Sequence, residues 1–297
     1  MRLCITGKNS YIGNAVEAHL KSSACTTPFE IEKISLKDAG WEEYSFQGTD
    51  CILHVAGIAH ADVGLADEQE KRRYYEVNCE LAVRVAKKAK AEGVKQFIYM
   101  SSIIVYGDSA PFFKGKHITA ETKPMPANFY GDSKWQAEQD LVKLQDDTFR
   151  VAIVRSPMVY GKGCKGNYRL LEKLAGMTPV FPKVKNERSM IYIENLAEFL
   201  RLLMLSGAGG CYVPQNKEYV NTSRMVYLIR KSKGHGMWLS YVLSLPVAVM
   251  GYMPGPPGRI AKKAFGSITV DPVFGDGNIK DYRIYTLEES IRRINEG

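Results

Sequence analysis

The sequence predicts an α/β fold: a doubly wound parallel sheet of the Rossmann type, followed by a smaller, mostly helical C-terminal lobe. Two observations predict this architecture. In the first half of the chain, short apolar runs alternate with amphipathic helical patterns, which is typical of parallel strands joined by crossover helices. In the second half, glycine-rich loops separate helices, and no clean linker divides the two halves. At 297 residues the chain is long enough for both parts.

The elements of residues 1–160 follow from the apolar runs and from the helical spacing between them. The first run leads into a glycine turn and a helix, and the later runs repeat that alternation. In chain order we expect the strand Arg2–Thr6, a helix from about Ile12 to Lys21, the strands Phe29–Leu36 and Cys51–Ala56, the helix Tyr75–Glu92, the strand Phe97–Ser101, a helix from about Gly131 to Leu144, and the strand Val151–Val154.

Residues 161–297 change character, because loop signals become frequent there. These signals lie at Gly161–Gly166, Ala208–Gly210 and Pro254–Gly258. Helices are expected at Asn195–Leu205 and Ser223–Lys231. We expect most of this part to form the smaller lobe, while parts of residues 186–215 return to the sheet.

The formal charge is +8, from 40 Lys and Arg against 32 Asp and Glu. This excess suits an anionic small substrate such as a nucleotide diphosphate, and taken alone it suits nucleic acid equally well. However, the basic residues are spread along the chain in short pieces such as Lys71–Arg73, which is typical of solvated helix faces. We therefore expect no nucleic-acid partner.

The six cysteines form no CxxC pair and show no zinc-finger spacing, so we expect no metal site. Several lie inside apolar runs and are predicted to be buried free thiols in a reducing compartment, the cytoplasm. The chain starts directly with a strand, so no signal peptide is expected.

Residues 236–253 are nearly uncharged and about as long as a short membrane span. Pro246 interrupts the run, and Ser240, Tyr241 and Ser244 add polar atoms. We therefore expect no transmembrane span. A buried helix pair or an oligomer contact is the first interpretation, and a peripheral membrane contact is the alternative.

The turn after the first strand has the features of a dinucleotide-binding loop. Glycines allow positive φ and close backbone approach, and the following helix offers free N–H groups to a pyrophosphate. The candidate cofactor-binding residues here are Gly7, Asn9, Ser10, Tyr11, Ile12 and Gly13. Ser10 stands where such turns often have a glycine, and it could either narrow the phosphate space or donate its hydroxyl. Residues 1–160 are thus expected to bind a dinucleotide.

The end of the second strand bears on which dinucleotide binds. An Asp or Glu at this position normally holds the ribose 2′-hydroxyl of NAD(H). Here Ser35 and Leu36 follow the strand, with Lys33 and Lys37 nearby, so a 2′-phosphate is tolerated. This favours NADP(H). NAD(H) remains the alternative, with Asp38 as the acid.

Tyr130 and Lys134 form the most informative pair in the sequence. Spaced four apart at a helix start, they share one face, and a nearby ammonium would lower the pKa of the phenol. Ser102 ends a predicted strand about 28 residues earlier, where a doubly wound sheet places its chemistry. We predict these three as the catalytic residues.

With these motifs the chain resembles the extended short-chain dehydrogenases/reductases, the NAD-dependent epimerase/dehydratase family that includes UDP-galactose 4-epimerase. Leu53–Gly57 is similar to the family's segment beside the nicotinamide ribose, and Arg188–Ala197 is similar to its RDYIHVxDLA segment. The resemblance implies that Tyr130 is the acid/base, that Lys134 holds the nicotinamide ribose and that Ser102 hydrogen-bonds the sugar oxygen. It also implies further cofactor-binding residues: Ser35, His54, Ala56, Gly57, Asn78 and Ser101.

On the substrate side, the resemblance implies that Arg188 binds the diphosphate of a UDP-sugar, as a fork donor suits phosphate oxygens. The closest resemblance is to capsule and O-antigen enzymes that reduce UDP-4-keto-6-deoxy-N-acetylhexosamines. Arg155–Gly161, Lys165–Tyr168, Phe265–Ser267 and Asp271 carry it. Epimerases of the group commonly have an Asn where Met158 stands, so Asn167 or loop backbone would orient the sugar instead.

The sequence therefore predicts an NAD(P)-dependent 4-keto reductase of a UDP-6-deoxy-N-acetylhexosamine, with a UDP-sugar 4-epimerase as the alternative. A regulator on this fold typically loses the Tyr or the Lys, and here both are present. Relatives commonly form homodimers through the two helices around Asn78–Ala91 and Tyr130. Leu81, Val85 and Ala89 fit such a contact face, although burial within the subunit explains them equally well.

Overall fold

The computed structural model describes residues 1–22, 27–37, 39–59, 66–109, 115–164, 166–253 and 255–296. Six parallel strands form its central sheet, in the order β10-β6-β4-β3-β1-β2. The strands are β1 (Arg2–Thr6), β2 (Glu30–Ile34), β3 (Cys51–His54), β4 (Gln96–Ser102), β6 (Arg150–Ser156) and β10 (Gly210–Tyr212). The predicted doubly wound α/β fold is confirmed, and the boundaries of the expected elements fall within two residues of the observed ones, with one exception described below.

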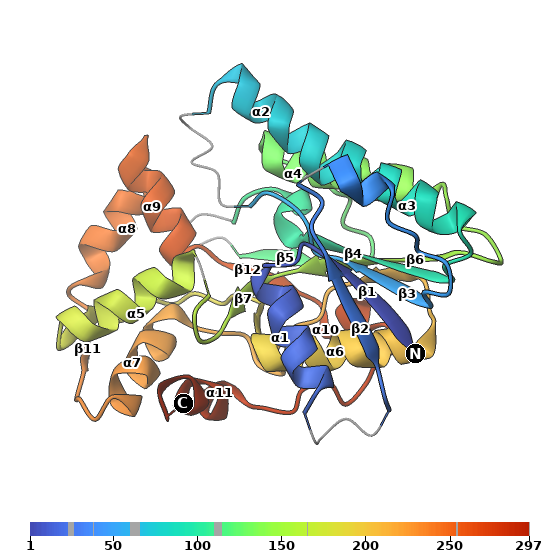
Figure 1. The fold of residues 1–297 in the computed structure, drawn as a ribbon. Coiled ribbons are helices and arrows are strands. Elements are labelled where there is room, and N and C mark those ends of the chain that lie inside the picture. The colour runs from blue at the N-terminus through green and yellow to red at the C-terminus, as the bar shows by residue number, and fades with distance from the viewer. Residues whose placement is uncertain are drawn as a thin grey trace.

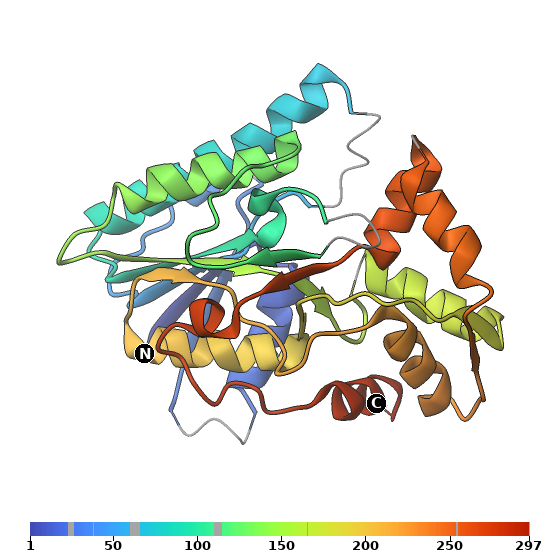
Figure 2. The ribbon, with the colours of Figure 1, turned by 180° about the vertical axis from the view of Figure 1, so that it is seen from behind.

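Helices cover both faces of the sheet (Figure 1). On one face α1 (Tyr11–Leu20) packs against α6 (Ile193–Ser206), and α6 runs along this face in Figure 2. On the other face lie α2 (Glu68–Tyr75), α3 (Leu81–Ala91) and α4 (Phe129–Val142). Because both faces are covered, β3 is buried along its whole length and reads as an apolar run. The strand order reverses at β1, because β2 lies on one side of it and β3 on the other. Sheets of this kind bind ligands at the point of reversal, beyond the carboxyl ends of the strands.

The exception among the boundaries is the helix expected at Tyr75–Glu92, which begins seven residues earlier. Asp67 caps α2 by accepting a hydrogen bond from the N–H of Glu70 at 2.7 Å. Residues 68–73 are all polar, so they lack the apolar periodicity that would have marked a helix. A π-helical turn, η2 (Glu76–Glu80), joins α2 to α3, and it contains Asn78.

The second half of the chain forms most of the lobe and also returns to the sheet through α6 and β10. Its helices are α5 (Asn167–Met177), α7 (Thr222–Ser232), α8 (Ser244–Tyr252), α9 (Pro256–Phe265), α10 (Pro272–Asp276) and α11 (Leu287–Glu296). Short parallel pairs tie it together: β7 (Met158–Tyr160) with β9 (Met190–Tyr192), β8 (Val180–Pro182) with β11 (Trp238–Ser240), and β5 (Lys116–Ile118) with β12 (Ile268–Val270). Two 3₁₀ turns complete the elements, η1 (Ala39–Glu42) and η3 (Ile103–Tyr106).

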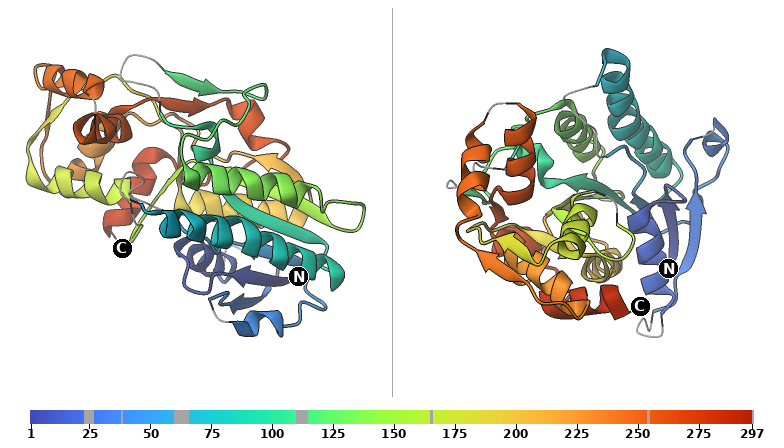
Figure 3. Two further views of the ribbon diagram at one scale, coloured as in Figure 1. Left: turned by 90° about the horizontal axis from the view of Figure 1, so that it is seen from above. Right: turned by 90° about the vertical axis from the view of Figure 1, so that its left-hand side faces the viewer.

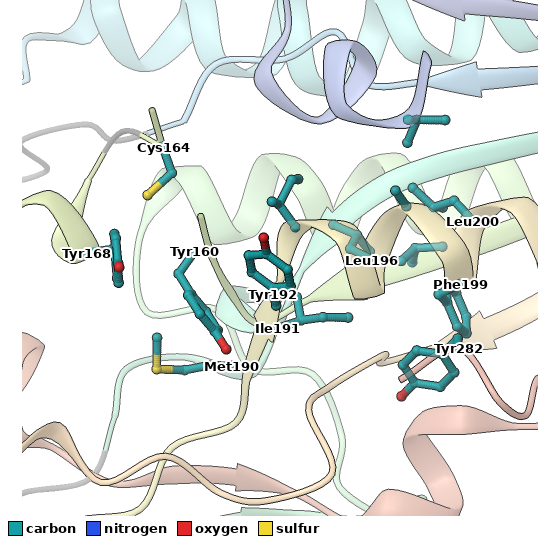
Figure 4. Packing of buried hydrophobic residues seen from close by; sticks show 14 of the residues in the cluster. Tyr160, Cys164, Tyr168, Met190, Ile191, Tyr192, Leu196, Phe199, Leu200 and Tyr282 are labelled. Carbon is teal, nitrogen blue, oxygen red and sulfur yellow. The ribbon is translucent and has the colours of Figure 1, made fainter. Parts of the chain in front are cut away.

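An aromatic cluster joins the lobe to the sheet (Figure 4). The ring of Tyr160 lies 5.5 Å from Tyr168 and 5.6 Å from Tyr192, measured between centroids. The Tyr160 hydroxyl also shares a hydrogen bond of 2.7 Å with Ser290 on α11 and accepts one from Asn216. Buried tyrosines with paired hydroxyls combine apolar packing with a fixed orientation. The lobe is therefore held rigidly at the carboxyl end of the sheet.

Two expectations about surfaces change with the structure. Residues 236–253 do form an element that packs against α9, but eight of their large apolar side chains are exposed, so the buried helix pair was wrong. No helix among the described residues is long and apolar enough to cross a membrane. Conversely, Val85 and Ala89 are fully buried within the subunit, so they do not form a contact face for a second copy.

Candidate active site

The glycine turn forms a close backbone approach at the switch point of the sheet. Gly7 has φ +87°, and a Cβ on it would lie 3.1 Å from the backbone of Ala56. The N–H of Gly7 donates to the carbonyl of Ile34 at 2.9 Å, which ties the turn to the end of β2. A side chain at position 7 would therefore fill the space between the two loops. The turn has the geometry that a pyrophosphate-binding loop requires.

Ser10 has a structural role at the start of α1. Its hydroxyl caps α1 by accepting a hydrogen bond from the N–H of Gly13 at 3.0 Å. A Cβ on Gly13 would lie 2.5 Å from this oxygen, so the glycine is needed for the cap. The first two N–H groups of α1, those of Tyr11 and Ile12, stay at the helix N-terminus without an intrahelical acceptor. These are the groups that an anion would meet.

At the end of β2 the two lysines differ. Lys33 donates to Asn14 at 2.6 Å and to Glu17 at 2.7 Å, so it is engaged with α1. Lys37 is exposed, and Ser35 accepts a hydrogen bond from its backbone N–H. Only Lys37 is therefore placed to meet a 2′-phosphate. The preference for NADP(H), which the sequence based on both lysines, now depends on Lys37 alone. Asp38 lies outside the described residues.

Ser102 and Tyr130 meet where β4 ends against α4. The Ser102 hydroxyl hydrogen-bonds with the Tyr130 phenol. Both side chains are half-buried, and Tyr130 also packs edge-on against Tyr74, with 5.9 Å between ring centroids. Asn128 caps α4 by accepting from the N–H of Gly131, so the helix starts just before Tyr130. The fold therefore brings together two of the three predicted catalytic side chains.

Lys134 lies one helical turn deeper than Tyr130. Its ammonium donates to the carbonyl of Met100 at 3.0 Å and lies 4.6 Å from the centroid of the Tyr99 ring. A Cβ on Gly57 would come within 3.2 Å of Lys134 Nζ, so the loop after β3 approaches this amine closely. Burial lowers the pKa of Lys134 to about 8 because a desolvated ammonium is disfavoured. Lys134 thus connects the catalytic strand with the predicted ribose-binding loop.

Burial dominates the pKa of the Tyr130 phenol. It raises this pKa to about 12, and the hydrogen bond with Ser102 lowers it only in part. The ammonium of Lys134, the group expected to lower this pKa, donates to the carbonyl of Met100. The phenol is therefore protonated at neutral pH, as an ordinary tyrosine is.

Three of the residues predicted to bind the cofactor have buried side chains. His54 is fully buried, its ring lies beside those of Phe97 and Tyr99, and its Nδ1 pairs with the Thr6 hydroxyl at 3.0 Å. Burial lowers its pKa to about 3, so it is a neutral core residue. Its predicted place beside the cofactor stays a prediction.

Asn78 and Ser101 connect elements around the site. Fully buried Asn78 accepts from the N–H of Ile58 at 2.8 Å and donates to its carbonyl and to Ser133 on α4. It therefore ties the loop after β3 to α4. The Ser101 hydroxyl donates to the buried carboxylate of Glu138. Their predicted cofactor contacts stay predictions.

Sequence reasoning missed the buried ion pair behind α4. Arg155 on β6 makes hydrogen bonds to both carboxylate oxygens of Glu138, at 2.7–3.2 Å, and donates to the Tyr106 hydroxyl. Glu138 is 2% exposed and Arg155 is 9% exposed. The signal was available, because Glu138 lies four residues after Lys134 and so shares its helix face. This pair fixes α4 against the sheet.

The substrate-side residues lie on separate elements. Half-buried Met158 begins β7, two residues after Ser156, which is opposite Ser102 in the β4–β6 register. Arg188 pairs through its backbone with Val220 and Ile268, and burial lowers its pKa to about 10. Asn167 begins α5, but its side chain is not among those described. Among the described residues, no group of three His, Cys, Asp or Glu side chains could hold a metal ion.

Comparison with known proteins places this geometry in a family. The chain is 29% identical to a UDP-glucose 4-epimerase of Vibrio cholerae, over 98% of this chain and 83% of that protein. It is 31% identical to an N-acetyl-α-D-glucosaminyl-diphospho-ditrans,octacis-undecaprenol 4-epimerase of Escherichia coli O157:H7, over 73% of this chain and 66% of that protein. A human epimerase family protein solved with NADPH shares the fold, with a TM-score of 0.77, 18% identity and coverage of 100% and 99% of the two chains.

The match to a family model covers the whole sheet except β10. It extends over residues 1–206, which include the glycine turn, Ser102, Tyr130 and Lys134. It also includes Arg188 and all of α6. The chain belongs to the RmlD substrate binding domain family.

Proposed function

We propose that this protein is an NAD(P)-dependent enzyme that transfers hydride to or from C4 of a diphosphate-linked sugar. The observation that carries the proposal is the contact between Ser102 and Tyr130 beside Lys134, at the carboxyl end of β4. The glycine turn fits a dinucleotide, since it combines the Gly7 approach with the N-terminus of α1. A relative of this fold was solved with NADPH, which supports the same cofactor class.

The residues of the chain have distinct chemical tasks in this proposal. When bound, the nicotinamide supplies or accepts the hydride. Tyr130 donates a proton to the sugar oxygen O4 during reduction and accepts it back during oxidation. Ser102 hydrogen-bonds that same oxygen and orients it toward the phenol. Arg188 binds the diphosphate, because its planar fork matches two phosphate oxygens.

The first candidate reaction is reduction of a UDP-4-keto-6-deoxy-N-acetylhexosamine in surface polysaccharide biosynthesis. Two sequence features support reduction. Met158 cannot make the hydrogen bonds of the Asn found in epimerases, and neither Ser35, Leu36 nor Lys37 is an acid. A reductase exchanges its cofactor in every cycle, and these features favour exchange over tight retention of NAD⁺.

The second candidate is 4-epimerisation, which the names of both relatives favour. In the first name the sugar is carried on a nucleotide diphosphate, and in the second it is carried on a lipid diphosphate. The deciding assay mixes the enzyme with NADPH or NADH and a UDP-4-keto-6-deoxy-N-acetylhexosamine, and follows absorbance of the reduced nicotinamide. Loss of absorbance with formation of the 4-hydroxy sugar supports the reductase. Interconversion of UDP-N-acetylglucosamine and UDP-N-acetylgalactosamine without added cofactor would establish the epimerase instead.

Cofactor preference has its own test. We expect NADP(H) to bind at least as tightly as NAD(H), because exposed Lys37 can meet a 2′-phosphate. Lys37→Glu should then weaken NADPH binding by about tenfold while NADH binding improves or stays unchanged. Calorimetric titration of both cofactors measures this. Tenfold tighter binding of NAD(H) by the unmodified enzyme would reject the preference.

A further inference from the structure

A continuous set of large apolar side chains is exposed on β11, on α8 and on the turn between them. Eight of the fifteen exposed large apolar residues among the described part of the chain lie within residues 238–253. They are Trp238, Tyr241, Val242, Leu243, Leu245, Val249, Tyr252 and Met253, here called the β11–α8 surface. Trp238, Val242 and Leu245 are 74%, 73% and 68% exposed. So many exposed large apolar side chains within one short segment indicate a candidate interaction site.

The secondary structure separates this surface cleanly from the core. On α8, Leu245, Val249 and Tyr252 follow one another at helical spacing and point outward. Val247 and Ala248 on the same helix pack against the main hydrophobic core instead. On β11 the exposed Trp238 alternates with Leu239, which packs inward. The segment is therefore anchored to the core on one side, and because α8 is apolar all round, its outer face is apolar as well.

Basic residues predominate in the sequence that contains this surface. From Tyr219 to Val270 it has seven Lys and Arg residues and no Asp or Glu, although Arg224 pairs with Glu218 and Glu288. Lys183 lies 4.6 Å from the centroid of the Tyr241 ring, and Lys183 and Lys185 together lower the pKa of that phenol. An apolar face bordered by lysines and bearing Trp and Tyr is the pattern of proteins that bind at a bilayer surface.

The dimensions allow insertion into the interface but not spanning. The nine residues of α8 extend about 13 Å, less than half of the hydrocarbon thickness of a bilayer. Figure 1 and the right view of Figure 3 show α8 and α9 at the outer end of the lobe, away from the sheet. Nothing in the described chain covers this end, so a planar surface can reach it.

We propose that the β11–α8 surface docks the protein on a lipid bilayer that carries anionic headgroups. The apolar side chains enter the boundary between headgroups and acyl chains, and the lysines contact the anionic headgroups. A second copy of the chain fits less well, because a symmetric contact would place the two basic borders against each other. Docking would hold the lobe at the membrane, where a sugar carried on a lipid diphosphate is presented, and this last consequence alone rests on the proposed function.

Vesicle flotation tests the apolar part of the proposal. The unmodified protein should float with vesicles of phosphatidylcholine and phosphatidylglycerol. Leu245→Ser/Val249→Ser should lower its partition coefficient by about tenfold or more, because the variant loses two apolar side chains that the membrane would bury. The matched control is Val142→Ser/Val273→Ser, which removes two exposed valines elsewhere and should bind as the unmodified protein does. Thermal unfolding of both variants shows that they are folded.

Fluorescence and salt test the geometry and the charge. Emission of Trp238 should shift to shorter wavelength when vesicles are added, and Trp238→Phe should abolish the shift. Binding should fall when phosphatidylglycerol is omitted or salt is raised, because screening weakens attraction between basic side chains and anionic lipid. None of these measurements uses turnover, so they are independent of the proposed function.

Two results would overturn the proposal. One is equal vesicle binding by the unmodified protein and by Leu245→Ser/Val249→Ser, or no binding by either. The other is light scattering, without vesicles, in which this variant converts a dimer into a monomer while vesicles bind neither form. That result would assign the surface to a second copy of the chain.

Discussion

At the residue scale, the candidate active site depends on proton positions at two side chains. Burial raises the pKa of Tyr130 to about 12 and lowers the pKa of Lys134 to about 8. Burial disfavours whichever form is charged, so it acts on the two pKa values in opposite directions. Near neutral pH the phenol is therefore protonated, and Lys134 is still mostly an ammonium.

Tyr130→Phe should reduce kcat by about 10² or more, the scale of a positioned general acid, while folding and cofactor binding remain intact. Phe keeps the edge-on packing against Tyr74 and removes only the hydroxyl. Steady-state turnover and cofactor titration measure the two effects separately. Near-full activity of this variant would show that another group is the acid.

The pKa of Lys134 predicts how the activity depends on pH. Its pKa of about 8 means that the ammonium is present below this pH and lost above it. For reduction we expect kcat/KM to fall as pH rises through about 8, and Lys134→Met should remove this inflection and weaken cofactor binding. Stability should change in the opposite direction. The pKa of Lys134 is lower in the folded state than in the unfolded state, so the unfolded state binds this proton more tightly. The free energy of unfolding should therefore rise between about pH 8 and pH 10.5. A flat kcat/KM profile between pH 7 and 9 would contradict the assignment.

At the scale of elements, α4 carries the predicted catalytic residues Tyr130 and Lys134, and buried polar contacts hold it on both sides. Asn78 links it through Ser133 to the loop after β3, and Glu138 links it to β4 and β6. The π-helical turn η2 gives Asn78 its position, since such turns offset one helix face. Polar networks of this kind specify one arrangement of packed elements.

Glu138→Gln should destabilise the protein by about 3–5 kcal/mol, because it leaves the buried guanidinium of Arg155 without its carboxylate. Glu76→Gln is the matched control. It breaks an exposed pair with Arg72, and the free energy of unfolding should change by no more than about 0.5 kcal/mol. Chemical denaturation of the three proteins provides the comparison. Equal stability of Glu138→Gln and the control would mean that the pair does not hold α4.

At the scale of the whole molecule, the homodimer expected from the resemblance stays a prediction, and its predicted contact has changed. Apart from Ala91 and Val142, which end α3 and α4, the exposed residues of the two helices are polar, among them Arg84, Lys87, Gln136 and Gln139. A dimer formed through these helices would depend on polar and charged contacts, so its affinity should fall as salt is raised. Light scattering at several salt concentrations measures this. A monomer at micromolar concentration would reject the dimer.

Much of the site was predictable because its signals are local. The glycine turn, the Tyr130–Lys134 spacing and the end of β4 at Ser102 all depend on neighbours within a few residues, and the observed turn, helix face and strand end agree with them. Helix and strand periods report which face of an element is apolar. The sequence by itself therefore determined the type of sheet, the elements and the catalytic helix.

The tertiary structure decided what each apolar or polar face meets. Residues 236–253 read as a buried pair, but no described element covers the outer face of α8. The ring of His54 lies against Tyr99, and the Ser101 hydroxyl donates to Glu138, two partners that the sequence did not indicate. Periodicity distinguishes the two faces of an element but does not identify the elements that pack against them. Those elements can lie more than a hundred residues away in the sequence, as α6 does from α1. Burial, and with it every pKa in the site, is therefore set by long-range packing.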